Sequence, residues 1–598
     1  MDWMFTAILV GAGLVAVSIL TSALAFRFGT PLLLVFLFIG ILAGEDGLGL
    51  SFDDAELAYL IGSLALAVIL FDSGFGTRTQ ALKRAAAPAF VLATVGVLLT
   101  TLLVGVAARF LFDLPWLHAL LMGAIISSTD AAAVFFLLRA GGVKIYKRVR
   151  SVLEVESGSN DPMAIFLTVL FIELILSDRE VNLLSSFLMG FGLQMGLGIS
   201  LGLASGYLIV QLINRMQLEE ALSHILVIAL ALCVFGFTAW LGGSGFLAIY
   251  VLGIVTGNLS MAGSTAFRRY QKGMTWLAQI IMFLVLGLFI TPSELVPVLI
   301  PALLLGLFLI LIGRPLAVLL CLLPFRYDWQ TITFNSLVGL RGAVSILLGI
   351  LPTVMGVPGA EIFLGVAFIM VLSSLLIQGW SIKPMAKKLD LVLPARLEAL
   401  ERIELELPGS PKHELLIYKM VKDSPILKNI DSLPRWAQPS LIIRNGNPMQ
   451  VHQVSKLESG DLVYLFATPE YARLLDQLFA STQGVDASDA EFFGQFQIHP
   501  DAKLTDLMAI YGMNVPMELP KDLSVADFML AALGSQPVVG DRVPLGNSEL
   551  VVREVHLGTT IADVGLSLMP EKHSDAYMRR YLRSVDRLPK GLQRCLAK

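Results

Sequence analysis

The sequence predicts an all-α polytopic membrane protein that is followed by small cytosolic α+β domains. Hydrophobic residues make up 56% of the 598 residues and charged residues only 15%, whereas soluble proteins contain about 25% charged residues. Long apolar segments recur as far as residue 386, after which charge and proline reach the density of soluble proteins. We therefore expect a transmembrane domain over residues 1–390 and a soluble tail of about 210 residues.

A helix that crosses a bilayer needs about 20 predominantly apolar residues. Thirteen segments meet or approach this length, and the shortest of them is 244–258. The expected spans are 4–25, 31–49, 57–74, 87–112, 116–138, 155–177, 184–213, 221–241, 244–258, 274–291, 295–323, 331–354 and 360–382.

The basic residues between these spans are distributed unequally. Lys383, Lys387 and Lys388 follow the last span, which favours a cytoplasmic C-terminus. Fourteen basic residues then fall in cytoplasmic loops, and the opposite loops contain only Arg179, with Arg109 near a span end. This asymmetry is the positive-inside pattern. It predicts an odd number of spans, an N-terminus outside and C-terminal domains in the cytoplasm.

Two acidic residues lie inside predicted spans, Asp130 and Asp161. An intramembrane carboxylate costs roughly 2.5–3.5 kcal/mol on insertion scales and indicates a functional site by default. Counted from Arg139 and Arg150, both acids lie roughly 14–17 Å from the cytoplasmic end at about 1.5 Å per residue. We therefore expect them to share a site for a small cation or a proton. A third acid, Asp72, is expected at a span end rather than in this site.

Helical spacing sorts the polar residues that surround Asp161. Ser157 and Asp161 are four residues apart and share one face of a helix, while Glu156 and Asn160 share another. Hard cations prefer oxygen ligands, so the first face is expected to contribute to an ion site. The predicted ligands of a monovalent cation are Thr129, Asp130, Ser157 and Asp161.

Two arginines also lie inside spans, Arg314 and Arg341. Arginine cannot be deprotonated in proteins, so each needs a counter-charge or exposed carbonyl groups. We expect Arg314 to pair with Glu156, with Arg341 as the alternative partner. Gly339 and Gly342 flank Arg341 and predict a helix break, and the polar segment 127–130 predicts a second one. Transporters built from inverted repeats place such broken helices beside the ion.

A shared carboxylate implies exchange chemistry, because a proton and a cation compete for Asp161. If only the loaded states cross the membrane, this competition produces antiport. Because Asn160 is an amide, the pair Asn160–Asp161 offers one titrating group, which favours one proton per monovalent ion. This stoichiometry is a hypothesis, since Asp130 could also titrate.

Four motifs resemble those of the monovalent cation:proton antiporter-1 family: Ser128-Thr129-Asp130, the run from Glu156 to Pro162, Gly313-Arg314-Pro315 and Gly339-Leu340-Arg341-Gly342. The resemblance implies the sodium/proton-antiporter fold, a homodimer in the bacterial inner membrane and elevator-like alternating access. It also implies that Asp161 carries the ion and the proton, and that Glu156–Arg314 is a structural ion pair. Ala131 stands where many sodium exchangers have proline, so K⁺ and Na⁺ both remain open as substrates.

The tail contains two regions with separate resemblances. Residues 401–482 are similar to the C-terminal half of a regulator of potassium conductance, and residues 488–582 to the transporter-associated domain of magnesium and cobalt efflux proteins. Together with the membrane part, they resemble potassium/proton antiporters of cell-volume regulation. The expected partners are a second copy of the chain, the lipid bilayer and a small-molecule regulator at the cytosolic domains. No cofactor beyond the transported ions is expected, and a net charge of −4 gives no indication of nucleic acid.

Two other function classes are weighed against antiport. A ligand-gated cation channel would fit the regulatory tail, but the sequence has no Thr-Val-Gly-Tyr-Gly filter. An intramembrane hydrolase would need a nucleophile with a base or a metal motif, and no His-Glu-x-x-His occurs. The sequence therefore favours a transporter, not an enzyme.

Overall fold

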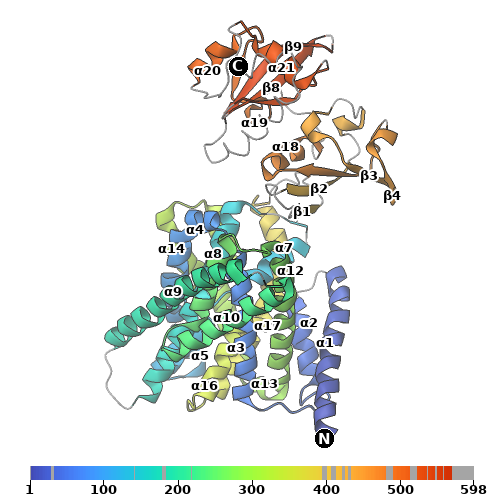
Figure 1. Ribbon diagram of the computed structural model, residues 1–598. Coiled ribbons are helices and arrows are strands. Elements are labelled where there is room, and N and C mark those ends of the chain that lie inside the picture. The colour runs from blue at the N-terminus through green and yellow to red at the C-terminus, as the bar shows by residue number, and fades with distance from the viewer. Residues whose placement is uncertain are drawn as a thin grey trace. The chain divides into compact units, whose positions relative to one another are not determined.

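The computed structural model describes two compact units, residues 1–393 and residues 394–598 (Figure 1). The described residues are 2–28, 32–140, 142–143, 145–177, 183–216, 218–392, 401–405, 413–420, 424–428, 433–454, 456–479, 489–511, 522–534, 536–545, 548–556 and 558–568. Arg179, which entered the loop-charge argument, lies outside them.

The first unit consists of helices. They are α1 (Asp2–Phe28), α2 (Leu32–Ala43), α3 (Ala55–Gly76), α4 (Thr79–Val91), α5 (Val97–Phe112), α6 (Trp116–Ile125), α7 (Ala131–Ala140), α8 (Lys147–Leu176), α9 (Leu183–Met216), α10 (Glu220–Trp240), α11 (Gly245–Asn258), α12 (Ser264–Leu288), α13 (Pro292–Phe308), α14 (Arg314–Leu322), α15 (Trp329–Leu337), α16 (Ala343–Val354) and α17 (Glu361–Lys388). Among the described residues, eight helices are long and apolar enough to cross a membrane, and five shorter apolar helices accompany them. Each of the thirteen predicted spans overlaps one of these helices, and the spans 116–138 and 331–354 each overlap two helices with a break between them.

Several helix boundaries differ from the predicted spans, and two of these differences concern residues near the site. Helix α8 begins eight residues before the predicted start at 155, and α12 begins ten residues before 274. The additional turns contain Arg150 and Arg268, which were expected in loops and which are exposed. An apolar-length criterion measures only the lipid-facing part of a helix, so it ends where the charged residues of the same helix begin.

Two long helices contain a short π-helical segment. The first is η1 (Leu92–Gly96) between α4 and α5, and the second is η2 (Leu309–Gly313) between α13 and α14; a 3₁₀ turn, η3 (Leu323–Phe325), follows α14. The second segment comes directly before Arg314 and Pro315. Proline cannot donate the usual helical hydrogen bond, and a π-bulge is a common way for a helix to continue past such a point.

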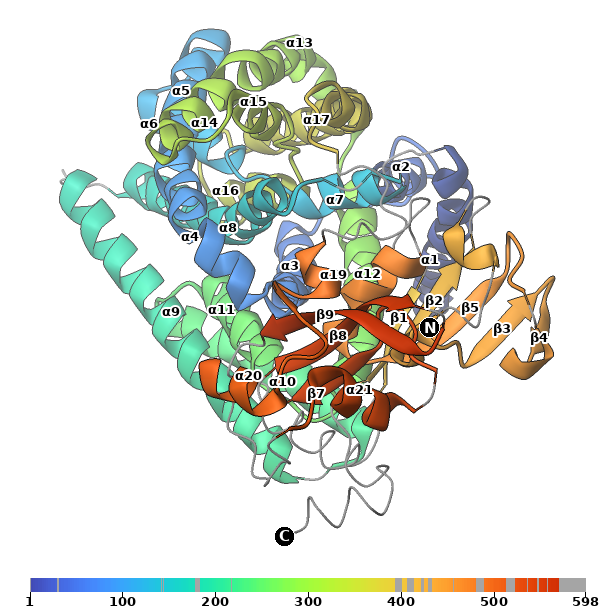
Figure 2. The same cartoon turned by 90° about the horizontal axis from the view of Figure 1, so that it is seen from above.

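The helices form two packed groups. One contains α2, α3 and α9–α12, and the other contains α5–α8 and α13–α17, with α16 and α8 contacting α3 between them (Figure 2). Glycines allow α3 and α11 to approach closely: an added Cβ at Gly74 would lie 2.2 Å from the Tyr250 carbonyl oxygen, and one at Gly257 would lie 2.2 Å from the Phe75 carbonyl oxygen. The backbones of α3 and α11 are therefore packed in direct contact at these glycines.

The second unit contains two antiparallel sheets. The first has the order β1-β2-β5-β3-β4 and the second the order β6-β9-β8-β7. The elements of the first part are β1 (Glu401–Leu405), β2 (His413–Lys419), η4 (Pro425–Lys428), η6 (Arg435–Ala437), β3 (Leu441–Arg444), β4 (Asn447–Met449), η7 (Val451–Gln453), β5 (Leu462–Ala467) and α18 (Pro469–Phe479). Those of the second part are α19 (Ala490–Phe493), β6 (Phe496–Ile498), α20 (Leu504–Ile510), α21 (Val525–Leu533), β7 (Arg542–Leu545), β8 (Ser548–His556) and β9 (Thr560–Leu568).

These two parts contact each other through buried and part-buried polar groups. The Trp436 indole donates to the Gly540 carbonyl at 2.9 Å, and the Arg435 amide donates to the Asp541 carboxylate at 2.8 Å. The Tyr471 hydroxyl donates to Glu549 at 2.6 Å. The sheets lie in the ranges 401–482 and 488–582, although residues 569–582 are outside the described part of the chain.

Candidate ion-binding site

Two helices are interrupted at the centre of the first unit, and the interruptions meet. The chain leaves helical geometry between α6 and α7 and again between α15 and α16. The Asp130 amide donates to the Leu340 carbonyl at 2.8 Å, which joins the two extended segments. One Asp130 carboxylate oxygen accepts from the Ala132 and Ala133 amides at 2.8 and 3.2 Å. Asp130 thus caps the start of α7, where helix amides have no internal partner.

Arg341 supplies hydrogen-bond donors to the carbonyl groups at the other end of the same interruption. Its side chain is almost completely buried, and its Nη1 donates to the Ser127 and Ser128 carbonyls, both at 2.5 Å. Its backbone amide donates to the Ser374 hydroxyl at 3.0 Å. The carbonyls that α6 leaves unpaired at its C-terminal end are therefore bound by a cation from the opposite interruption.

Asp161 lies next to the first interruption. The Ser128 hydroxyl donates to one of its carboxylate oxygens, and the side chain of Asp161 is buried. Among the residues that the structure describes, no basic side chain forms an ion pair with it. The carboxylate of Asp161 therefore has no fixed counter-charge, unlike that of Glu156.

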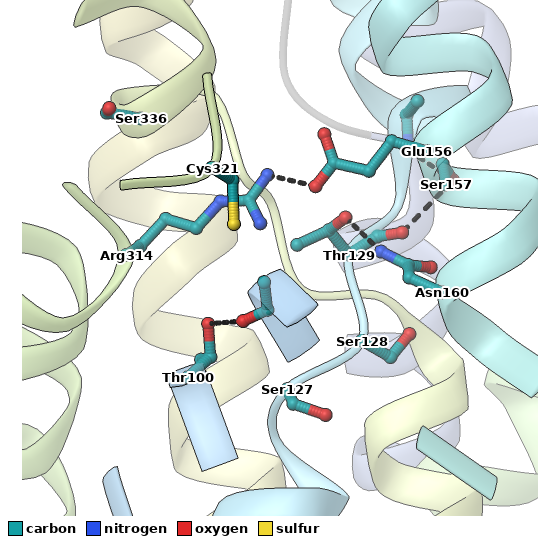
Figure 3. Close-up of polar contacts among 12 residues, drawn as sticks. Thr100, Ser127, Ser128, Thr129, Glu156, Ser157, Asn160, Arg314, Cys321 and Ser336 are labelled. Atoms are coloured by element: carbon teal, nitrogen blue, oxygen red, sulfur yellow. Dashed lines mark hydrogen bonds and ion pairs between the residues drawn. The ribbon is translucent and has the colours of Figure 1, made fainter. Parts of the chain in front are cut away.

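Other residues of α8 hold the interruption in place (Figure 3). The Ser157 hydroxyl donates to the Thr129 carbonyl and accepts from the Ala131 amide, both at 3.0 Å. The Asn160 amide group donates to the Thr129 hydroxyl at 2.5 Å. The side chain of Thr129 therefore faces Asn160, and the two faces of α8 both contact the segment before α7.

Glu156 and Arg314 form a buried ion pair, which Figure 3 shows as a contact between α8 and the start of α14. Their side chains are only 1% and 4% exposed. Arg314 is buried and does not extend to an exposed surface, and the Arg341 guanidinium donates its hydrogen bonds to carbonyls. The structure thus distinguishes the roles of the two arginines that the sequence left open.

A cavity of about 520 Å³ leads to this site. Exposed Arg150, Arg268 and Lys272 line its outer part, and Asp130 and Asp161 line its inner part. Ser157 also lines it, but Thr129 does not. Of the four predicted ligands, three therefore face the cavity and Thr129 lies behind its wall.

Asp72 lies in the wall of the same cavity on α3, four residues before the end of that helix. It is thus near a span end, and it lines the same cavity as Asp161.

Sequence reasoning did not include Ser128 among the site residues, although its hydroxyl contacts Asp161. The signal was its position in the polar run directly before Asp130. The hydrogen bond from the Asp130 amide to the Leu340 carbonyl was not predicted either. A backbone contact between two distant segments depends on the fold and cannot be read from the residue types.

Residues 14–388 match the family model of the transmembrane sodium/hydrogen exchanger, and residues 489–570 match that of the transporter-associated domain. A relative named K(+)/H(+) antiporter NhaP2 from Shewanella baltica is 42% identical over 95% of this chain and 98% of its own length. The Na(+)/H(+) antiporter ApNhaP from Aphanothece halophytica is 27% identical over 72% of this chain and 86% of its own.

Among solved structures, the sodium proton antiporter MjNhaP1 from Methanocaldococcus jannaschii matches over 65% of this chain and all of its own chain, with a TM-score of 0.57 and 23% identity. This likeness shows the same fold in the transmembrane unit. The broken and crossing helices, the matched family model and the full-length relatives lead to one conclusion. The chain belongs to the sodium/hydrogen exchanger family of multi-pass membrane antiporters, and not to a family of enzymes.

Proposed function

We propose that this protein exchanges cytoplasmic K⁺ for H⁺, with Asp161 as the group for which the two ions compete. The observation that supports this most directly is the Asp161 carboxylate, which is buried, lines a solvent-connected cavity and has no basic partner among the described residues. A permanently paired acid such as Glu156 could not release and rebind ions, whereas an unpaired one can.

The surrounding groups suit a weakly held monovalent cation. Asp130 and Ser157 line the cavity beside Asp161 and supply oxygen atoms, which hard cations prefer. Arg341 and the N-terminal ends of α7 and α16 add positive charge behind the site, which limits how strongly a cation binds. Protonation of Asp161 removes the charge that attracts the cation, so each carboxylate state favours one of the two ions.

K⁺ is the proposed substrate, and Na⁺ is the alternative. The relative that matches nearly the whole chain at 42% identity has a name that states K⁺/H⁺ exchange, and the one with Na⁺ in its name matches less of the chain at lower identity. The Asn160 amide, which bonds to Thr129, adds no second titrating group to α8. We therefore propose exchange of one proton per cation.

The proposed setting is the inner membrane of a bacterium, with the N-terminus outside and the C-terminal unit in the cytoplasm. The basic residues at the cavity mouth and in the cytoplasmic loops support this orientation. We further propose a homodimer, and a role in pH, potassium and cell-volume homeostasis.

Residues 401–482 are proposed to be a C-terminal domain of the potassium-conductance regulator type that binds a small-molecule regulator. Its five-stranded sheet and its contacts with residues 489–568 support a compact regulatory unit. Truncation after residue 395 tests this: unchanged apparent ion affinity and an unchanged pH response would remove the regulatory role.

The main experiment measures collapse of a pH gradient in everted membrane vesicles on addition of K⁺, Na⁺, Rb⁺ or Li⁺. The wild-type protein should respond to K⁺, and Asp161→Asn should abolish the response. Asp72→Asn is the matched control, because it removes an acid from the same cavity away from the interruption, and it should retain exchange. Full activity of Asp161→Asn, or ion currents that need no proton gradient, would contradict the proposal and favour a channel.

A further inference from the structure

One face of α8 presents charged and small residues to the cavity at helical spacing. Arg150, Glu154, Gly158 and Asp161 all line the cavity, and successive members are three or four residues apart. They therefore form a stripe along one side of the helix. Arg150 lies 3.7 Å from Glu154 within this stripe.

Tyr250 of α11 packs directly against the glycine of the stripe. A Cβ atom added to Gly158 would lie 2.4–2.6 Å from the Tyr250 ring and hydroxyl, a separation at which one group must move. No side chain larger than hydrogen fits there. In addition, Pro162 cannot donate the helical hydrogen bond to the Gly158 carbonyl, so α8 is less tightly hydrogen-bonded at this contact.

Tyr250 is held on a rigid support. Its carbonyl lies against Gly74, and further glycine contacts lock α11 to α3. The contact between Tyr250 and Gly158 is therefore a contact between the α3–α11 pair and the helix that carries Asp161. A shift of α8 along its own axis relative to α3–α11 would slide the stripe past the Tyr250 ring.

The hydroxyl of Tyr250 is buried, and Thr77, Ser159 and Glu154 all lie near it. Among the described residues it has no hydrogen-bond partner. A buried hydroxyl without a partner is costly, and such groups in native proteins commonly have a functional explanation. A hydrogen-bond partner that reaches the Tyr250 hydroxyl only in another conformation would explain why it is unpaired here.

The stripe offers such a partner. The cavity opens beside the first turns of α8, so exposure of Asp161 on the opposite side requires α8 to move away from that end. The residue that then replaces Gly158 opposite Tyr250 is the one four positions earlier on the same face, Glu154. Four residues correspond to a shift of about 6 Å along the helix axis.

We propose that Tyr250 is a positioning residue for the transport cycle: its ring seats Gly158 in the state described here, and its hydroxyl donates to Glu154 in the state open to the opposite side. This inference rests on the proposed exchange function, because it assigns a residue to the change of access. Tyr250 acts through α8 and does not touch the ion. The hydrogen bond to Glu154 offsets the loss of the close Gly158 contact.

The test uses the full chain without its native cysteines and with Ala132→Cys, an exposed residue of the cavity. Tyr250→Phe keeps the ring and removes only the hydroxyl. Loss of a hydrogen bond to a charged group changes a two-state population by about tenfold or more, so Tyr250→Phe and Glu154→Gln should each slow exchange about tenfold. Labelling of Ala132→Cys by a membrane-impermeant thiol reagent should not decrease, because the state described here becomes the favoured one.

The double variant Tyr250→Phe/Glu154→Gln decides the inference. If the two groups bond in the opposite state, the double variant exchanges no more slowly than either single variant. Independent effects that multiply, or unaltered exchange in Tyr250→Phe, would overturn it. Gly158→Ala should reduce both labelling and exchange, and Tyr250→Ala in the same chain should restore labelling by making room.

Wild-type protein and Asp161→Asn are measured in the same preparation. If wild-type protein exchanges ions and Asp161→Asn does not, while Tyr250 and Glu154 act independently, only the role of Tyr250 fails. If wild-type protein shows no exchange, the proposed function fails.

Discussion

Removal of one member of the Glu156–Arg314 pair should destabilise the transmembrane unit severely. Both side chains are at least 96% buried, so Glu156→Gln leaves a guanidinium in the interior without its carboxylate. Breaking such a pair costs about 3–5 kcal/mol. At about 2 °C per kcal/mol, the value for larger domains, the melting temperature in detergent should fall by roughly 6–10 °C.

Removal of both charges should lower the stability of the transmembrane unit much less. One Glu156 carboxylate oxygen and Arg314 Nε have no hydrogen-bond partner among the described residues, so the pair is incompletely satisfied. A paired replacement of a buried ion pair by uncharged groups of similar volume is often neutral or stabilising. We therefore expect Glu156→Gln/Arg314→Met to regain most of the loss seen in Glu156→Gln.

The assay is thermal unfolding followed by fluorescence-detected size exclusion. The control is Arg109→Met, which breaks an exposed pair with Asp113 whose carboxylate is 95% exposed. Exposed pairs contribute about 0–1 kcal/mol, so its melting temperature should change by no more than about 2 °C. A double variant as unstable as Glu156→Gln would show that the two residues stabilise the unit separately and would refute the argument.

Three further predictions concern the interruption, the stoichiometry and the soluble unit. In Gly342→Ala, the new Cβ would lie 2.7 Å from the Asp130 Cβ; overpacking costs about 1–3 kcal/mol, and vesicle assays should show loss of exchange in folded protein. Asn160→Asp adds a second titrating group, and exchange in reconstituted liposomes should then respond to membrane potential. In the soluble unit, burial alone would raise the pKa of Asp461, but hydrogen bonds from the Arg444 guanidinium and a backbone amide lower it on balance. A carboxylate whose pKa is lowered in the folded state stabilises the fold at pH values above its usual pKa of about 4. This stabilisation is lost as the pH falls through the folded pKa. Hydrogen-exchange protection of β3 and β5 should therefore decrease in acid, and Asp461→Asn should remove this dependence.

Much of the membrane unit could be predicted because its physical signals are local. The cost of exposed backbone in lipid makes the spans apolar helices, and polar or glycine-rich interruptions at 127–130 and 339–342 mark where helices end. The Glu156–Arg314 contact followed from the need of each buried charge for an opposite one.

The remaining features depend on contacts between distant segments. The position of Ser128 against Asp161, and of Thr129 against Asn160, is decided by the rotation of the extended segment before α7. Helical spacing does not describe that segment. The strand order of the first soluble sheet, in which β5 lies between β2 and β3, likewise depends on packing rather than on alternation along one strand.

The hydrogen bonds of Arg341 have a consequence for energetics. The Arg341 side chain of the second interruption donates hydrogen bonds to backbone carbonyls of the first. The Asp130 amide of the first interruption donates to the Leu340 carbonyl of the second. The two interruptions are thus joined by hydrogen bonds in both directions, and neither can move alone without breaking them. The backbone groups around Asp130 therefore keep their mutual arrangement in any movement that carries both interruptions together.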